Sequence, residues 1–248
     1  KKHLFNPAES IKVFDRGPQI KNLFFVTMTE YEKELTAVSA FPPEKIKFPL
    51  GKILTQANLR QLHMSESEKE RFVTYYFNGQ REETFINEDR HIIPSPKVPT
   101  YDKKPEMSAQ LIADYIVSQV QSGSYDFIVI NFANVDMVGH TGNLKATIQA
   151  CQVVDECVGK MFAAIDQVGG TLVITADHGN AEEMINLTTN GIDTEHNANP
   201  VPLIIAGRDF KTGQLLPQGI LADVAPTILS LMNLPASSQM TGRSLLKA

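Results

Sequence analysis

Acidic and imidazole side chains that could bind a metal ion follow two short apolar runs of this sequence. Asp177 and His178 come after a run of leucine, valine and isoleucine, and Asp136 and His140 come after a second such run. A buried strand that leads straight into such groups is typical of a strand end that faces a ligand. Carboxylates and imidazoles together form the ligand set of a hard or borderline divalent metal. These four residues, with His196 from a later polar stretch, are therefore candidate ligands.

Each of these groups also has a plainer interpretation. Asp136 and His140 are four residues apart, which would place them on one face of a helix, although nearby glycines make a loop an equal alternative. Asp177 would serve equally as the N-cap of a following helix, with His178 at the surface. His196 would fit an ordinary polar loop. The residues by themselves leave these alternatives open.

Alternating strands and helices must position these groups. We expect a strand over 127–132, a long helix over 144–168 and a strand over 171–175. A strand, a helix and a strand in this order normally give parallel strands with a right-handed crossover. The carboxyl ends of parallel strands share one rim of a sheet, where open α/β sheets bind ligands. The four groups that follow the two strands are therefore expected at one rim.

Further elements are expected on either side of this unit. Helical spacing predicts a helix over 50–62, and Asn78-Gly79 between two apolar runs predicts a β-hairpin of residues 72–77 and 83–86. The remaining expected elements are an extended, proline-rich connector at 94–105, a helix from Pro105 to Gly123, a strand over 201–206 and a helix over 223–232.

The length and the amino-terminal pattern indicate one main domain and part of another. Residues 1–45 offer one strand, 23–28, which cannot enclose a core, and prolines at 42 and 43 mark a boundary. We expect residues 1–45 to be the tail end of a second α/β domain with its linker. Residues 46–248 would form the main domain without its amino-terminal part. The first residue is not methionine, so we expect the chain to continue upstream.

Composition and charge exclude several classes of partner. The net charge is −5, with 23 Lys and Arg against 28 Asp and Glu and no long basic run, which argues against nucleic acid. No apolar stretch approaches the roughly 20 residues that span a bilayer, which argues against a membrane protein. Cys151 and Cys157 have neither a disulfide framework nor metal-ligand spacing. A reducing cytoplasm therefore fits best. We also expect a monomer.

Several ordered motifs resemble one enzyme family. The segments at 134–142, 175–182 and 194–202 are similar to the carboxyl half of cofactor-independent (2,3-bisphosphoglycerate-independent) phosphoglycerate mutases, in the alkaline-phosphatase superfamily. The resemblance runs from Pro49 to the end, with a looser fit over 23–35. It implies a three-layer α/β/α sandwich of the alkaline-phosphatase type, and a glycolytic isomerase that interconverts 3- and 2-phosphoglycerate.

The resemblance also implies two divalent metal sites, with manganese as the family's metal. Asp136, His140 and His196 would bind one ion. Asp177 and His178 would supply part of the second site. In the family, a serine nucleophile and an aspartate complete that second site, and both come from an amino-terminal segment that begins Asp-Gly-x-Gly. This segment is absent here, so we expect an incomplete second site and an inactive chain that needs its missing amino-terminal segment.

The resemblance also implies a residue that binds the substrate phosphate. Lys69 matches a lysine that contacts the phosphate, although its charged surroundings at 65–70 would also fit a solvated surface. The family places an Arg-x-x-Arg pair before the segment that resembles 23–35. The first arginine of this chain is Arg16, which leaves the replacement for that pair open.

Two alternatives to the mutase remain. One is another phosphomutase or phosphatase of the superfamily, similar to phosphopentomutase. The other is a catalytically dead module that binds a metal or a partner and has lost its nucleophile. A phosphoryl transfer needs an acceptor, and the family's acceptor is the missing serine. An upstream reading frame with the Asp-Gly-x-Gly start would distinguish a truncation from a degenerate protein.

Overall fold

The computed structural model describes residues 22–31, 37–186, 188–210 and 213–246. The chain divides into two compact units, Lys1–Lys45 and Ile46–Ala248. In the first unit, strands β1 (Val26–Thr27) and β2 (Val38–Ser39) form a short parallel pair. The strand expected over 23–28 is thus present but much shorter. Arg16 lies outside the described residues, and the identity of the domain from which this unit comes stays a prediction.

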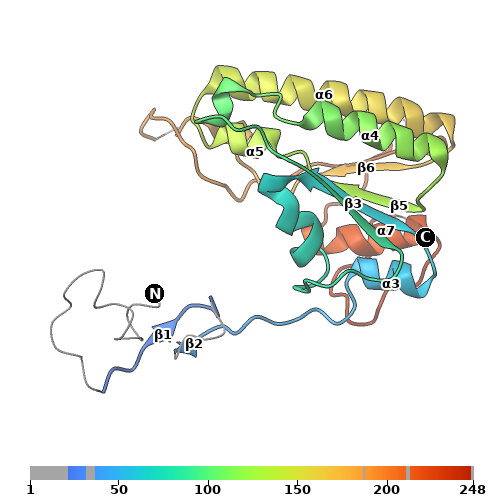
Figure 1. Ribbon diagram of the computed structural model, residues 1–248, viewed down its shortest axis with the longest axis horizontal. Coiled ribbons are helices and arrows are strands. Elements are labelled where there is room, and N and C mark those ends of the chain that lie inside the picture. Colours follow the sequence, from blue (N-terminus) through green and yellow to red (C-terminus); the bar gives the residue numbers. More distant parts are fainter. Residues whose placement is uncertain (1–21, 32–36, 187, 211–212, 247–248) are drawn as a thin grey trace. The chain divides into compact units, whose positions relative to one another are not determined.

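The second unit has helices on both faces of its strands (Figure 1). Three strands form a parallel sheet in the order β4-β3-β5, and the other two form an antiparallel pair, β6-β7. Helices α4 and α6 cover one face, and α3 and α7 lie on the other. This is the expected three-layer α/β/α architecture. The strands are β3 (Gln61–Glu66), β4 (Glu88–Ile93), β5 (Phe127–Ile130), β6 (Leu172–Thr175) and β7 (Leu203–Ala206). The helices are α3 (Leu50–Gln56), α4 (Ala109–Ser122), α5 (Asn134–Gly139), α6 (Leu144–Gln167) and α7 (Val224–Leu231).

The core is built on the central strand β3, whose residues are all buried. Alternate side chains of β3, Leu62 and Met64, pack with Ile112 and Ile116 of α4 and with Met161 of α6. Burial of a side chain of this size stabilises the fold by about 1.5–3 kcal/mol. The helical spacing that predicted α4 and α6 is therefore confirmed in part: Ile112, Ile116 and Met161 are buried, whereas Leu111 of α4 and Ile148 of α6 are exposed. Among the described residues, no helix is both long and apolar enough to cross a membrane.

The helix expected over 50–62 is wrong in its second half. Helix α3 ends at Gln56, and Asn58 adopts a left-handed conformation with a φ of 59°. The Leu59 amide donates back to the Leu54 carbonyl, 3.0 Å away, which closes the last turn. Leu62 then belongs to β3. Leu59 and Leu62 are three residues apart, as on one face of a helix, but they lie after the end of α3 and Leu62 belongs to a strand.

The β-hairpin across Asn78-Gly79 is also wrong. Phe72–Tyr76 forms a π-helical turn, and Gly79 ends it with a φ of 67°. The Gln80 amide donates to the Tyr75 carbonyl at 2.8 Å, so the Asn-Gly pair closes a helix instead of joining two strands. The following strand, β4, pairs in parallel with β3. Aromatic residues favour strands only weakly, and here packing against the rest of the unit overrides that preference.

The strand-helix-strand unit around α6 is present, but its strand pairing differs from the expected parallel arrangement. Strand β5 is hydrogen-bonded to β3, whereas β6 has the antiparallel strand β7 as its partner among the described residues. The helix after Pro105 begins at Ala109 and ends at Gly123, whose φ is 63°. The later strand and helix lie within the expected ranges, and a short 3₁₀ turn, Tyr101–Lys103, interrupts the connector.

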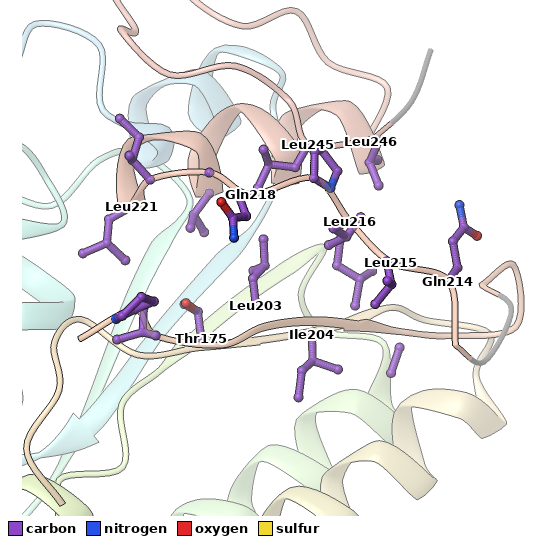
Figure 2. Close-up of a pocket in the computed structure, with 18 of the residues that line it drawn as sticks. Thr175, Leu203, Ile204, Gln214, Leu215, Leu216, Gln218, Leu221, Leu245 and Leu246 are labelled. Atoms are coloured by element: carbon purple, nitrogen blue, oxygen red, sulfur yellow. The ribbon is translucent and has the colours of Figure 1, made fainter. Parts of the chain in front are cut away.

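A cleft of about 1280 Å³ lies beside the β6-β7 pair. Thr175 and Leu203 line it from the two strands, while Leu216 and Leu245 line it from the carboxyl-terminal part of the chain (Figure 2). Most of the lining side chains are apolar, but Asp177 also borders the cleft. A large apolar cleft thus opens directly beside one pair of the predicted ligands.

Candidate metal centre

Helix α5 places the first two predicted ligands next to each other. It follows β5 directly, and His140 stands just after its last residue. Because Asp136 and His140 are four residues apart on a helical turn, their side chains share one face. His140 Nε2 lies 3.1 Å from Asp136 Oδ1. The helical alternative for this segment is therefore correct, and the loop alternative is not.

His196 reaches the same carboxylate oxygen from a distant loop. Its Nε2 lies 3.0 Å from Asp136 Oδ1 and 3.0 Å from His140 Nε2. The backbone amide of Asn197 donates to the Gly179 carbonyl at 3.0 Å, which holds this loop against the segment after β6. The structure thus brings together three residues that the sequence separates by up to 60 positions.

The surrounding backbone fixes how His140 presents its ring. His140 Nδ1 lies 2.7 Å from the Thr194 carbonyl, which can only accept a hydrogen bond, so Nδ1 carries the proton. In the neutral ring the lone pair is then on Nε2, the atom that faces Asp136. A carbonyl that fixes the tautomer in this way is the usual support of a metal-binding histidine.

The spacing of these donor atoms fits a metal ion. The three separations among Asp136 Oδ1, His140 Nε2 and His196 Nε2 are 3.0–3.1 Å. Ligands that bind at about 2.1 Å and at right angles to one another lie about 3.0 Å apart. One carboxylate with two imidazoles also suits a divalent ion in charge and in donor type.

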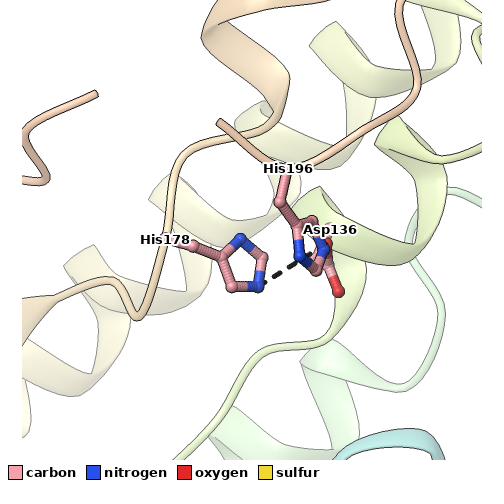
Figure 3. Close-up of side chains that lie close together, drawn as sticks. All are labelled: Asp136, His178 and His196. Atoms are coloured by element: carbon pink, nitrogen blue, oxygen red, sulfur yellow. Dashed lines mark hydrogen bonds and ion pairs between the residues drawn. The ribbon is translucent and has the colours of Figure 1, made fainter. Parts of the chain in front are cut away.

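The second predicted pair lies beside this trio. His178 Nε2 is 3.9 Å from Asp136 Oδ1 and 3.5 Å from Asp177 Oδ2. The rings of His178 and His196 stack with their centroids 3.6 Å apart, and both approach Asp136 (Figure 3). One donor atom each from Asp136, His178 and His196 lie within 4.8 Å of one another. His178 therefore stands between the two groups of predicted ligands.

Lys69 is buried at this centre. Only 5% of the residue is exposed, so the solvated-surface alternative is wrong. Its Nζ pairs with Asp136 Oδ2 and lies 4.6 Å from the centre of the Phe72 ring. Burial alone raises the pKa of Asp136, but the hydrogen bond and charge of Lys69, with His140 and Asn180, outweigh burial and hold this pKa below its ordinary value. The carboxylate is therefore ionised at neutral pH.

One contributor was not predicted. Asn180 donates from Nδ2 to Asp136 Oδ1 at 3.0 Å. The only sequence feature that pointed to Asn180 was its position directly after Asp177-His178-Gly179. An amide side chain does not ionise and seldom binds metals, so its residue type did not suggest a role. Its role can be read only from the contact itself.

Comparisons with known proteins agree with a metal-binding role. The metalloenzyme superfamily model matches residues 23–236. The chain is 48% identical to the 2,3-bisphosphoglycerate-independent phosphoglycerate mutase of Thermomicrobium roseum, over 97% of this chain and 47% of that protein. It is 49% identical to the corresponding mutase 2 of Methanosarcina barkeri, over 94% of this chain and 43% of that protein.

A solved structure supports the same grouping. The crystal structure of Leishmania mexicana phosphoglycerate mutase at low cobalt concentration matches all of this chain with a TM-score of 0.79 and 28% identity, over 48% of that protein. The chain therefore spans about half the length of the relatives that it matches.

Proposed function

We propose, from the premise that this chain belongs to the metalloenzyme superfamily, that it is the metal-binding half of a cofactor-independent phosphoglycerate mutase. The complete polypeptide would interconvert 3- and 2-phosphoglycerate through a phosphoserine. The observation that carries this proposal is the meeting of Asp136, His140 and His196 at one point. The relatives named above are all phosphoglycerate mutases, which favours this substrate over a phosphopentose.

Each residue of the centre would have a defined task. Asp136, His140 and His196 would hold one ion, and a bound ion would supply positive charge that stabilises the phosphoryl group during transfer. The ammonium group of Lys69 lies on the far oxygen of Asp136, where it would contact a phosphate brought to the centre. Lys69 is already buried beside the Phe72 ring, so its side chain would not have to leave solvent when the phosphate binds.

The second site needs residues from elsewhere. Asp177 and His178 give one carboxylate and one imidazole, and two ligands hold a divalent ion weakly. They border the apolar cleft beside β6-β7. We propose that a segment from the other half of the complete protein fills this cleft and supplies the missing carboxylate and serine. The apolar lining suits a buried chain segment better than a free small acid.

The proposal also covers the identity of the metal and the cellular location of the protein. Carboxylate and imidazole ligands accept manganese, cobalt, zinc or iron, and manganese is the ion that we propose. The Leishmania relative was crystallised with cobalt, which makes cobalt the natural second ion to test. We further propose that the complete protein acts as a cytoplasmic monomer in glycolysis.

A chimaera tests the function directly. This chain would replace the matching region of the Thermomicrobium roseum mutase, and coupled assays would follow the interconversion of the two phosphoglycerates. The chimaera should be active, whereas the 248-residue chain alone should be inactive because it lacks the acceptor serine. His196→Ala should abolish activity, and His91→Ala, which removes a histidine stacked on Tyr115, should preserve it. A folded chimaera that binds manganese but transfers no phosphate would contradict the proposal, as would activity of the isolated chain.

A further inference from the structure

We propose that Asn180 is a positioning residue that fixes the carboxylate of Asp136 in the orientation that the metal requires. This role rests on the metal centre of the proposed function. Asn180 is only 5% exposed, and its Nδ2 donates to Asp136 Oδ1 at 3.0 Å. A buried side chain amide with one specific acceptor is directional, because both groups lose their other hydrogen bonds to water.

The oxygen that Asn180 contacts is the one that matters for a metal. Oδ1 of Asp136 faces His140 and His196, while Oδ2 is paired with Lys69. The carboxylate is therefore held at both oxygens, by a cation on one and by a neutral amide on the other. A carboxylate oxygen can accept from the amide and still offer a second lone pair to an ion. A neutral donor also orients this oxygen without placing a second positive charge beside a divalent ion.

Helix α5 is shaped to admit this amide. Gly139 lies three residues after Asp136, so it faces the same side of the helix. A Cβ atom at position 139 would lie 2.5 Å from Asn180 Oδ1 and 3.1 Å from its Cγ. Any larger residue would therefore push Asn180 away from Asp136. Glycine is a poor helix former, and the close approach of Asn180 gives a physical reason for its presence here.

The loop that carries Asn180 is held independently of the metal. The backbone N–H of Asn180 donates to Glu182 Oε2 at 2.9 Å. Asn199, three residues after His196, donates to Glu182 Oε1 at 3.2 Å. The segment that carries His178 and the segment that carries His196 are thus joined through Glu182, and Asn180 connects both of them to helix α5. Asn180 can therefore position Asp136 before any ion arrives.

Manganese titration of the chelator-stripped 248-residue chain by calorimetry tests this role. Asn180→Ala should weaken manganese binding about 10-fold or more, as loss of a group that orients a metal ligand usually does. The matched control is Asn78→Ala, which removes another buried asparagine that donates to a carboxylate, Glu88. That control should lower the melting temperature of the metal-free protein but leave manganese affinity unchanged.

Gly139→Ala provides a second route that does not alter the amide itself. It should reproduce the loss of affinity by displacing Asn180, and it should have little further effect in an Asn180→Ala background. Gly159→Ala on α6, where a Cβ atom would meet nothing within 4 Å, is the control for a glycine replaced in a helix. It should leave affinity unchanged.

The outcomes separate this role from the proposed function. If the unaltered chain binds manganese and both Asn180→Ala and Gly139→Ala bind it equally well, the positioning role is overturned while the metal centre stands. Additive losses in the double variant would also overturn the role, because Gly139 would then act by another route. If the unaltered chain binds no manganese, the metal centre and the positioning role fail together.

Discussion

Two parts of the main unit place a histidine beside a carboxylate, and only one of them suits a metal ion. In the metal centre, His140 Nε2 lies 3.1 Å from Asp136 Oδ1. In a second cluster, between strands β3 and β4, His63 Nδ1 lies 3.8 Å from Glu88 Oε1. The presence of an imidazole near a carboxylate therefore does not by itself identify a ligand site.

The second cluster, which we call the buried polar cluster, surrounds its carboxylate with hydrogen-bond donors. Glu88 accepts hydrogen bonds from Asn78 Nδ2 at 2.7 Å, from the Phe85 amide at 2.9 Å and from Arg90 Nε at 2.7 Å. His63 Nδ1 donates to the Val73 carbonyl at 2.7 Å. The side chains of His63 and Glu88 are fully buried. Three donors of the protein itself therefore surround the Glu88 carboxylate, which does not need an ion to balance its charge.

The metal centre has the opposite arrangement. The side chains of His140 and His196 are 38% and 47% exposed, and their Nε2 atoms face the same oxygen of Asp136. Nitrogens that face one another at 3.0 Å need a shared proton or a shared cation between them. The two regions therefore differ in two ways. In the metal centre the donor atoms converge on one point and are accessible to solvent, whereas in the buried polar cluster they contact groups of the protein and are shielded from solvent. The arrangement of the metal centre favours ligand binding and that of the buried polar cluster favours stability.

The largest expected effect belongs to the buried polar cluster. Glu88→Ala would leave Arg90 and Asn78 without their carboxylate partner inside the unit. Removal of one member of a buried ion pair typically costs about 3–5 kcal/mol, and the value here should be near the lower end because the Arg90 side chain is 22% exposed. Urea unfolding of the metal-free protein measures this loss. Manganese affinity should not change, and a metal defect in this variant would mean that the two regions are not independent.

The fold was predictable where apolar spacing repeats over several turns. Helices α4 and α6 are long enough for apolar residues to recur at helical intervals, which predicts both helices although Leu111 and Ile148 of that pattern are exposed. The segment Phe72–Tyr76 was not, because its aromatic residues favour strands in isolation while its actual partners come from elsewhere. The Val73 carbonyl, for example, accepts a hydrogen bond from His63 Nδ1 of strand β3 at 2.7 Å. Short segments are decided by such contacts, which periodicity does not contain.

The candidate site was predictable in part for a similar reason. The spacing of Asp136 and His140 suggested a shared face, whereas the approach of His196 followed only from a resemblance. The buried polar cluster could not be predicted, because Glu88 meets His63 through the register of two parallel strands 25 residues apart. Register and loop paths depend on the whole fold.

A second, smaller effect would sharpen the comparison at the metal centre. Asp136→Asn keeps the shape of the side chain but removes the charge that an ion needs, so manganese affinity should fall about 100-fold. Calorimetric titration measures this change. Asp126→Asn, at an exposed carboxylate whose Oδ2 lies 3.9 Å from Arg60 Nε, should bind manganese as the unaltered chain does. Equal manganese affinities for the unaltered chain and for Asp136→Asn would show that other residues bind the metal.

The smallest expected effect is a dependence of stability on pH that comes from His63. Burial lowers the pKa of His63 below its ordinary value of 6.5, and this outweighs the opposing effect of Glu88. The unfolded chain therefore binds a proton more readily than the folded chain as the pH falls below 6.5. Protonation then favours unfolding, so the contribution of His63 should make the folded state less stable as the pH decreases through this range and more stable as it rises.

Urea unfolding of the metal-free protein between pH 7.5 and about 5.5 measures this slope, because the interval brackets the ordinary histidine pKa. His63→Gln removes the titrating ring and should flatten the dependence, even if it changes the stability at every pH. If His63→Gln and the unaltered chain gave parallel curves, the ring of His63 would be no harder to protonate in the folded state than in the unfolded chain. Burial of His63 would then no longer set the buried polar cluster apart.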